Sequence, residues 1–250
     1  MAVEHAKMRL EARVASRKSL TLLESNLKTK RSRTAKTRRR TATPEERRRQ
    51  LIAAAISCIA KRGLAETTIT TVAQEAGLSQ GIINLHFRTK ERLLTETLRY
   101  LSDEYRNACR QAAAAAEASP VAGLQAMVDL DFRPSICSRD KLAVWFAFWG
   151  ERKFRPTYRR LCAARDKSYD DMVRGMCTAL CEQGNYPSVE PALVADGLSA
   201  LTDGLWLDLL VRPESMSREL ASRVTMTYLA GVFPRHFQPL PATRQPIRQR

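Results

Sequence analysis

The sequence has few of the residues that build catalytic or metal sites. Its 250 residues include only three histidines, at positions 5, 86 and 236. It has no Cys-x-x-Cys pair, and no histidine at zinc-ligand spacing accompanies Cys177 and Cys181. We therefore expect no metal, no cofactor and six reduced cysteines. The sequence also lacks a recognisable nucleophile–base pair and a glycine-rich phosphate loop, which argues against an enzyme.

Long hydrophobic runs are missing as well. The longest unbroken run, residues 142–149, is far shorter than the ~20 residues that span a bilayer, and the N-terminus has no apolar signal core. We expect a cytoplasmic, nucleoid-associated protein with no membrane partner. Hydrophobic residues make up 44% of the chain, which is enough for a core in one or two globular domains.

Acidic residues are scarce near both ends of the chain. Residues 1–43 carry 13 basic and 3 acidic residues, and residues 234–250 carry 4 basic and none acidic, within a net charge of +16. Such tails favour a polyanionic partner, most simply nucleic acid, although basic runs also solubilise proteins. We expect residues 1–43 to be a disordered basic arm, which a start codon assigned too far upstream would also create, and residues 238–250 a disordered tail.

Strong helix signals begin at the end of the arm. Thr43 and Glu46 have the spacing of a capping box, and Pro44 suits the first helical position. Apolar residues then recur at helical spacing as far as Gly63, which is typical of a helix end.

Two shorter helices are predicted next. The first covers residues 69–76 and ends at Gly77, and the second covers about 80–86 with Ser79 as its cap. Two short helices joined by a tight glycine-containing turn are typical of a helix-turn-helix.

The rest of the chain also reads as helical. Thr89 caps a predicted helix over about 90–118, and no segment shows the period-two alternation of a strand. We predict an all-α fold, with a three-helix helix-turn-helix DNA-binding domain over 44–92 and a helical ligand-binding and dimerisation domain over 93–237. Further helices are expected to open at Pro120, Ser138, Pro156, Val189 and Ser217.

Residues 67–94, TTITTVAQEAGLSQGIINLHFRTKERLL, resemble the DNA-binding signature of TetR-family regulators. The resemblance implies a homodimer whose two heads bind a palindromic double-stranded operator, while a helical body binds a small effector. The family usually has aromatic residues at the positions of Asn84 and Leu85, but neither of these two residues is aromatic. The resemblance also implies backbone contacts to DNA from Asn84, His86 and Lys90.

The chemistry of the same segment suits a reader of the major groove. Helix N-termini offer free N–H groups to phosphates, and Gly81 permits close approach. Hydroxyl groups can contact phosphates, Gln80 a base edge or phosphate, and Ile82 a thymine methyl. His86 is either a phosphate contact or a helix C-terminal cap, whereas Ile83 and Phe87 are expected in the core. The predicted DNA-binding residues are Thr70, Thr71, Ser79, Gln80, Gly81, Ile82, Asn84, His86 and Lys90.

All three tryptophans lie in two segments of the body, residues 142–149 and 201–207. Their helical spacing fits either a core wedge or an aromatic wall. The two segments resemble the BetI-type branch of the family, the repressors of choline-to-glycine-betaine genes, which implies choline or a relative as the effector. Aromatic faces with a nearby carboxylate recognise a quaternary ammonium. The predicted ligand-binding residues are Trp145, Phe148, Trp149, Asp203 and Trp206.

We expect dimerisation through the last two helices, over about 190–211 and 217–235. A wide apolar stripe follows the first of them, and Gly197 and Gly204 allow close helix approach. The stripe consists of Leu193, Val194, Gly197, Leu198, Leu201, Leu205 and Leu209. Two other functions stay open: a TetR-type regulator with a different effector, and a nonspecific nucleic-acid-binding protein.

Overall fold

The computed structural model describes residues 42–117 and 119–238, and every regular element within these ranges is helical. The chain divides into two compact units, Met1–Glu46 and Arg47–Arg250. Most of the predicted arm and all but Gln238 of the predicted tail lie outside the described residues. In the first unit the capping box is confirmed. The Thr43 N–H donates to Glu46 Oε2 at 2.7 Å, and the Glu46 N–H donates to Thr43 Oγ1 at 3.1 Å.

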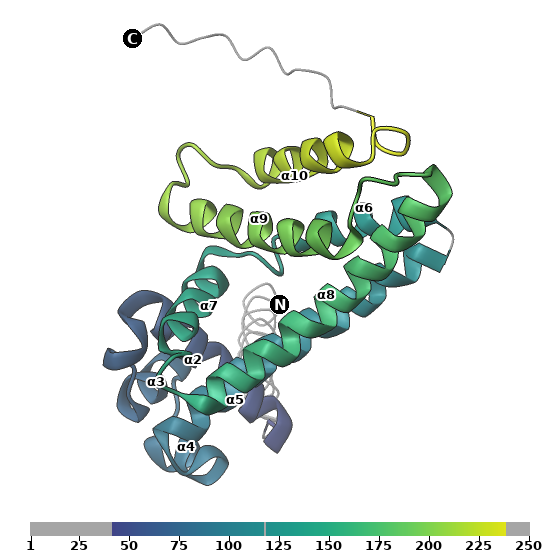
Figure 1. Ribbon diagram of the computed structural model, residues 1–250. Helices are drawn as coiled ribbons and strands as arrows, with labels where there is room; N and C mark the ends of the chain where they lie inside the picture. Colours follow the sequence, from purple (N-terminus) through teal and green to yellow (C-terminus); the bar gives the residue numbers. More distant parts are fainter. Residues whose placement is uncertain (1–41, 118, 239–250) are drawn as a thin grey trace, which may run out of the picture. The chain divides into compact units, whose positions relative to one another are not determined.

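Three helices begin the described chain (Figure 1): α2 (Pro44–Glu66), α3 (Ile69–Ala76) and α4 (Gln80–Phe87). The limits of α3 and α4 agree with the sequence prediction to within one residue. Gly63, the predicted end of the first helix, has non-helical backbone angles (φ 79°, ψ 172°), so α2 is kinked there and only a short further stretch continues to Glu66.

The body helices follow the predicted starts closely. The helix expected over 90–118 ends earlier, because its last turn tightens into a 3-10 helix before Pro120. The start expected at Val189 falls two residues later, since Pro191 lacks an N–H and fits the first turn. The body elements are α5 (Lys90–Ala113), η1 (Ala114–Glu117), α6 (Pro120–Asp131), α7 (Arg139–Glu151), α8 (Pro156–Gly184), α9 (Pro191–Val211) and α10 (Arg218–Val232).

Two hydrophobic clusters stabilise these helices. The smaller cluster joins α2, α3, α4 and the first turn of α5, and includes the fully buried Val72, Ile83 and Phe87. Each buried side chain of this size contributes about 1.5–3 kcal/mol relative to exposure. The larger cluster fills the body, and Ile56 packs against both clusters. The predicted core positions of Ile83 and Phe87 are therefore confirmed.

Helix α8 is the central contact of the body, packing on α5, α6, α7 and α9. Figure 1 shows α5 and α8 running alongside each other, and α10 beside α9. This packing brings side chains from α5, α7 and α9 around the middle of α8. None of the described helices is long and apolar enough to cross a membrane.

Candidate functional site

The helix-turn-helix is built by local capping. The Thr71 N–H donates to Thr68 Oγ1 at 3.1 Å, and the Thr68 N–H donates to Thr71 Oγ1 at 2.8 Å, which together cap α3. Gly77 ends α3 in the left-handed conformation, with φ 63°. Ser79 occupies the N-cap position of α4, as predicted, but its side chain makes no cap hydrogen bond. The Ser79 hydroxyl is therefore available to another acceptor or donor.

Helix α4 separates a buried face from an exposed one. Ile83 and Phe87 are completely buried, whereas Gln80, Gly81, Asn84 and Leu85 are exposed. Leu85 leaves 77% of its surface accessible. A methyl group on Gly81 would meet only the Ser79 hydroxyl, at 3.7 Å, so the N-terminal turn of α4 presents nearly bare backbone. Such a surface admits the close approach of a DNA backbone or groove.

Several of the predicted DNA-binding side chains have partners within the protein. Gln80 Nε2 donates to Thr70 Oγ1 at 2.9 Å, which brings the two helices of the motif together at this point. Lys90 Nζ donates to the Ala65 carbonyl at 2.9 Å. The Thr71 hydroxyl already serves the cap of α3. Ile82 is half-buried against the smaller cluster, and His86 is half-buried in the last turn of α4.

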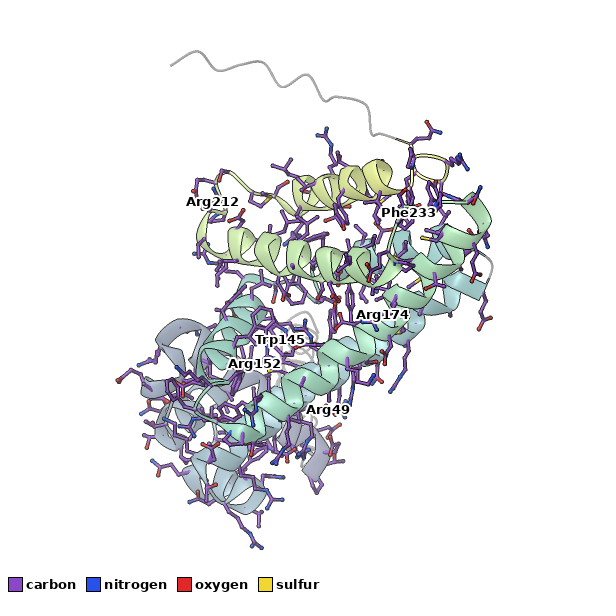
Figure 2. All side chains as sticks on the ribbon, viewed as in Figure 1. Arg49, Trp145, Arg152, Arg174, Arg212 and Phe233 are labelled. Atoms are coloured by element: carbon purple, nitrogen blue, oxygen red, sulfur yellow. The ribbon has the colours of Figure 1, made fainter. Side chains whose placement is uncertain are left out.

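A second group of residues gathers around α8 in the body. The Arg165 guanidinium lies 4.8 Å from the ring centroid of Tyr105, 5.0 Å from Trp145, 5.3 Å from Trp149 and 5.6 Å from Trp206. We call these four rings the aromatic cage. Trp145, labelled in Figure 2, projects from α7 to this guanidinium on α8. All three tryptophans of the chain therefore surround one cation that belongs to the chain itself.

Arg165 is only 5% exposed and incompletely hydrogen-bonded. Its Nε lies 3.0 Å from Asp166 Oδ1 and its Nη2 lies 3.9 Å from Asp203 Oδ1. Neither Nε nor Nη1 has a hydrogen-bond partner among the described residues. Four aromatic rings and two carboxylates thus surround this buried charge. A desolvated cation over an aromatic face gains about 2 kcal/mol or more.

Asp131 supports the cage from the end of α6. Tyr105 donates to its Oδ1 at 2.6 Å and Tyr169 to its Oδ2 at 3.0 Å, while the Trp206 indole N–H donates to its carbonyl at 2.9 Å. Burial raises the pKa of Asp131 to about 7, against the opposing effect of the two tyrosine hydrogen bonds and Arg165. Two of the four cage rings are therefore held in place by one buried residue.

Asp203 lies at the edge of the cage rather than inside it. Its side chain keeps 42% of its surface exposed. Partial burial still raises the pKa of Asp203 to about 6, opposed chiefly by Arg165. Phe148 is not one of the rings over Arg165. It is fully buried and packs edge-on against Tyr158, with ring centroids 4.9 Å apart.

Sequence reasoning had brought the tryptophans and Asp203 together but missed Arg165, Tyr105 and Asp131 as parts of one site. A signal for Arg165 was present. Tyr158, Cys162, Arg165 and Tyr169 recur at helical spacing and are all buried. A charged residue within an apolar stripe needs a partner inside the protein.

The exposed face of α9 differs from the stripe that the sequence had indicated. Val194, Leu198 and Leu205 are buried within the chain, and a methyl group on Gly197 would lie 2.6 Å from the Tyr228 hydroxyl. Gly197 therefore serves the packing of α10 on α9. The positions that share the exposed face are Leu193, Asp196, Ala200, Gly204, Leu207 and Val211, so this face is largely apolar with one acidic residue.

Known proteins match this chain both in the helix-turn-helix and in the body that holds the aromatic cage. Residues 51–97 match the tetR family of bacterial regulatory proteins, and residues 120–234 match the C-terminal domain of BetI-type transcriptional repressors. The HTH-type transcriptional regulator BetI of Ectopseudomonas mendocina is 35% identical over 73% of this chain and 91% of its own length. The regulator of the same name from Serratia proteamaculans is 32% identical over 77% of this chain and 96% of its own.

Solved structures agree with these matches. A transcriptional regulator from Pseudomonas aeruginosa PAO1 superimposes with a TM-score of 0.67 at 25% identity, covering 81% of this chain and 99% of that one. A regulator from Saccharomonospora viridis, solved in complex with choline, superimposes with a TM-score of 0.62 at 27% identity. It covers 72% of this chain and 94% of its own.

Proposed function

Because this chain belongs to the TetR family of bacterial transcriptional regulators and has a BetI-type C-terminal domain, we propose that it is a dimeric repressor whose affinity for a palindromic operator is changed by a quaternary ammonium effector. The head, residues 44–92, reads the DNA. The body, residues 93–237, binds the effector and forms the dimer. Choline or a close relative is the expected effector, and genes of choline or glycine betaine metabolism are the expected targets.

The single observation that carries the DNA-binding part is the exposed N-terminal half of α4. Gln80 and Gly81 leave this end of the helix polar and open, while Ile83 and Phe87 anchor its opposite face in the core. A rigidly seated helix with an accessible N-terminus is the arrangement that reads base edges in the major groove.

The effector part is supported by the aromatic cage. Four rings already surround a positive charge, and the related regulator from Saccharomonospora viridis was solved with choline. Trp145, Trp149 and Trp206 supply aromatic faces, and Asp203 supplies a carboxylate at the edge. Phe148 instead packs on Tyr158 in the core.

The dimer is supported by the exposed face of α9. Leu193, Leu207 and Val211 leave 63%, 43% and 58% of their surface accessible, and Gly204 beside them has no atom that a methyl group would meet within 4 Å. A largely apolar, low-relief helix face of this kind, with Asp196 at its margin, fits a second copy of itself across a twofold axis. A twofold dimer also matches the symmetry of a palindromic operator.

One experiment tests the whole proposal. The full chain is used to select its preferred sequence from a random pool of duplex DNA, and binding to the selected duplex is then titrated with choline. We expect an inverted repeat, a large preference over random DNA at physiological salt, and a several-fold change in operator affinity on adding choline. Equal affinity for selected and random DNA would instead favour a nonspecific nucleic-acid-binding protein. Specific binding without any response to choline would leave a regulator with another effector.

A further inference from the structure

We propose that Arg165 is a built-in competitor of the effector: its guanidinium occupies the aromatic cage in the ligand-free protein, and a quaternary ammonium binds by displacing it. The inference rests on the proposed function of the same site and adds how that site is regulated. The cage has one cation-binding position, defined by the faces of Tyr105, Trp145, Trp149 and Trp206.

The distances argue for exclusive occupancy. The guanidinium carbon lies within 5.6 Å of all four ring centroids, which is the separation at which a ligand cation would itself stand over these rings. A trimethylammonium group cannot share that space with a guanidinium, because both would need the same van der Waals contacts. Entry of one cation therefore requires exit of the other.

The charges near the cage suit a cation and not an anion. The carboxylates of Asp131, Asp166, Asp170 and Asp203 interact with Arg165 and with one another, while Arg152 acts on Asp203 and Arg174 acts on Asp170. With Arg165 displaced towards solvent, the rings would lie in a negatively charged environment. An anionic ligand that paired with Arg165 Nη1 in the cage would lie near the same carboxylates, which repel it.

The carboxylates at the edge offer Arg165 a second position. Asp203 and Asp166 keep 42% and 29% of their side-chain surface exposed, and each already lies within 4 Å of an Arg165 nitrogen. A long, flexible side chain can leave the rings and remain paired with these two acids nearer to solvent. Inside the cage, the exchange replaces one positive charge with another.

Displacement would change what holds the body helices together. In the structure, one side chain of α8, that of Arg165, contacts rings on α5, α7 and α9. A free ligand makes the ring contacts without a covalent connection to α8. Ligand binding thus releases α8 from the aromatic cage. Helix α5, which contributes Tyr105 to the cage, follows the proposed DNA-reading helix α4 after only two residues, Arg88 and Thr89.

The test measures binding of tetramethylammonium and choline to the full chain by calorimetry and by quenching of tryptophan fluorescence. Arg165→Gln removes the competitor, and we expect both cations to bind it at least tenfold more tightly than they bind the wild type. The apparent affinity for a site is reduced by the fraction of molecules in which it is available. A neutral ligand of choline's shape, 3,3-dimethyl-1-butanol, should gain by a similar factor, because vacating the cage helps any ligand of that shape. A gain confined to the cations would point to relief of charge repulsion alone and would overturn the competitor role.

Arg152→Gln is the matched control. Arg152 pairs with the same Asp166, at 3.2 Å, but does not stand over any of the cage rings. Its removal changes the local charge by the same amount, so an equal gain in Arg152→Gln would overturn the competitor role.

Unchanged or weaker binding by folded Arg165→Gln would also overturn the competitor role while leaving the choline proposal intact. Absence of binding in both folded proteins would overturn both proposals. Binding by the variant alone would support the competitor role and remove choline as the effector of the wild type.

A measurement on the wild type guards against loss of folding in the variant. Phenylglyoxal modifies accessible arginines, and mass spectrometry of peptides locates the modified residues. Saturating choline should raise modification of Arg165 several-fold relative to the exposed Arg174. Unchanged or reduced modification of Arg165 with choline bound would overturn displacement.

Discussion

Arg155 Nη1 and Glu91 Oε2 lie 2.8 Å apart, which joins the residue that precedes α8 to the first turn of α5. Arg155 also bonds Glu151 at the end of α7 and stacks over Tyr158. Because α5 follows α4 after two residues, this ion pair connects the body helices α7 and α8 to the helix-turn-helix. Both side chains are about half exposed, so the pair contributes little to stability, about 0–1 kcal/mol.

The first prediction concerns this connection. Glu91→Gln should change the melting temperature very little but reduce the factor by which the effector alters operator affinity several-fold. The measurement is a set of DNA titrations with and without choline. Asp171→Asn, which breaks the exposed Lys167–Asp171 pair farther along α8, is the control. A coupling factor that stays the same in Glu91→Gln would show that the signal does not pass through Arg155.

The second prediction concerns pH. Because burial raises the pKa of Asp131 to about 7, the folded state holds this proton more tightly than the unfolded state does. Its contribution to stability is present below the usual carboxyl pKa of about 4 and is lost as the pH rises to about 7. Asp203, with a pKa of about 6, acts in the same direction but is partly exposed.

Urea unfolding of the wild type and Asp131→Asn at several pH values checks this dependence. The free energy of unfolding of the wild type should fall relative to the variant by about 1 kcal/mol or more between pH 4.5 and 7.5. Asp203→Asn should remove a smaller part of the slope. Parallel curves for wild type and Asp131→Asn would show that Asp131 does not titrate in this range.

The third prediction separates base reading from backbone contact. Gln80→Ala should lose affinity mainly at one base pair of the selected operator, by about 1–3 kcal/mol, while Lys90→Ala should weaken binding to all duplexes and lower the salt slope by about one. Titrations against single-base operator variants at several salt concentrations distinguish the two patterns. Arg174→Ala, an exposed change on α8, is the control. Uniform losses in both head variants would assign Gln80 to the backbone.

The fourth prediction concerns the dimer. Leu207→Glu places a charge in the exposed apolar face of α9 and should convert the protein to a monomer in sedimentation velocity, because an unpaired charge is costly to bury. Operator affinity should fall with it, since one head binds only a half-site. Phe154→Glu is the control, because it places the same charge on a side chain that is 73% exposed in the connection between α7 and α8, away from the α9 face. A dimeric Leu207→Glu protein would place the interface elsewhere.

The sequence alone was sufficient for the helix-turn-helix, because local contacts define it. Thr68 and Thr71 cap α3 within one turn, Gly77 takes the left-handed conformation that ends it, and Thr89 caps α5. Such signals act over three or four residues, so they can be read without knowing what packs on the helix. The clustering of the tryptophans in two segments was likewise visible, although their common partner was not.

The occupant of the aromatic cage was decided by the tertiary structure. Tyr105, Trp145, Arg165 and Trp206 come from four helices spread over about a hundred residues, and helical spacing cannot say which faces of those helices meet. The same limit applies to α9, which carries more apolar residues than the core of one chain buries. Packing against the other body helices buries Val194 and Leu198 and leaves Leu207 and Val211 exposed. Periodicity identifies an apolar helix, but only the contacts between helices determine which of its faces is left for a partner.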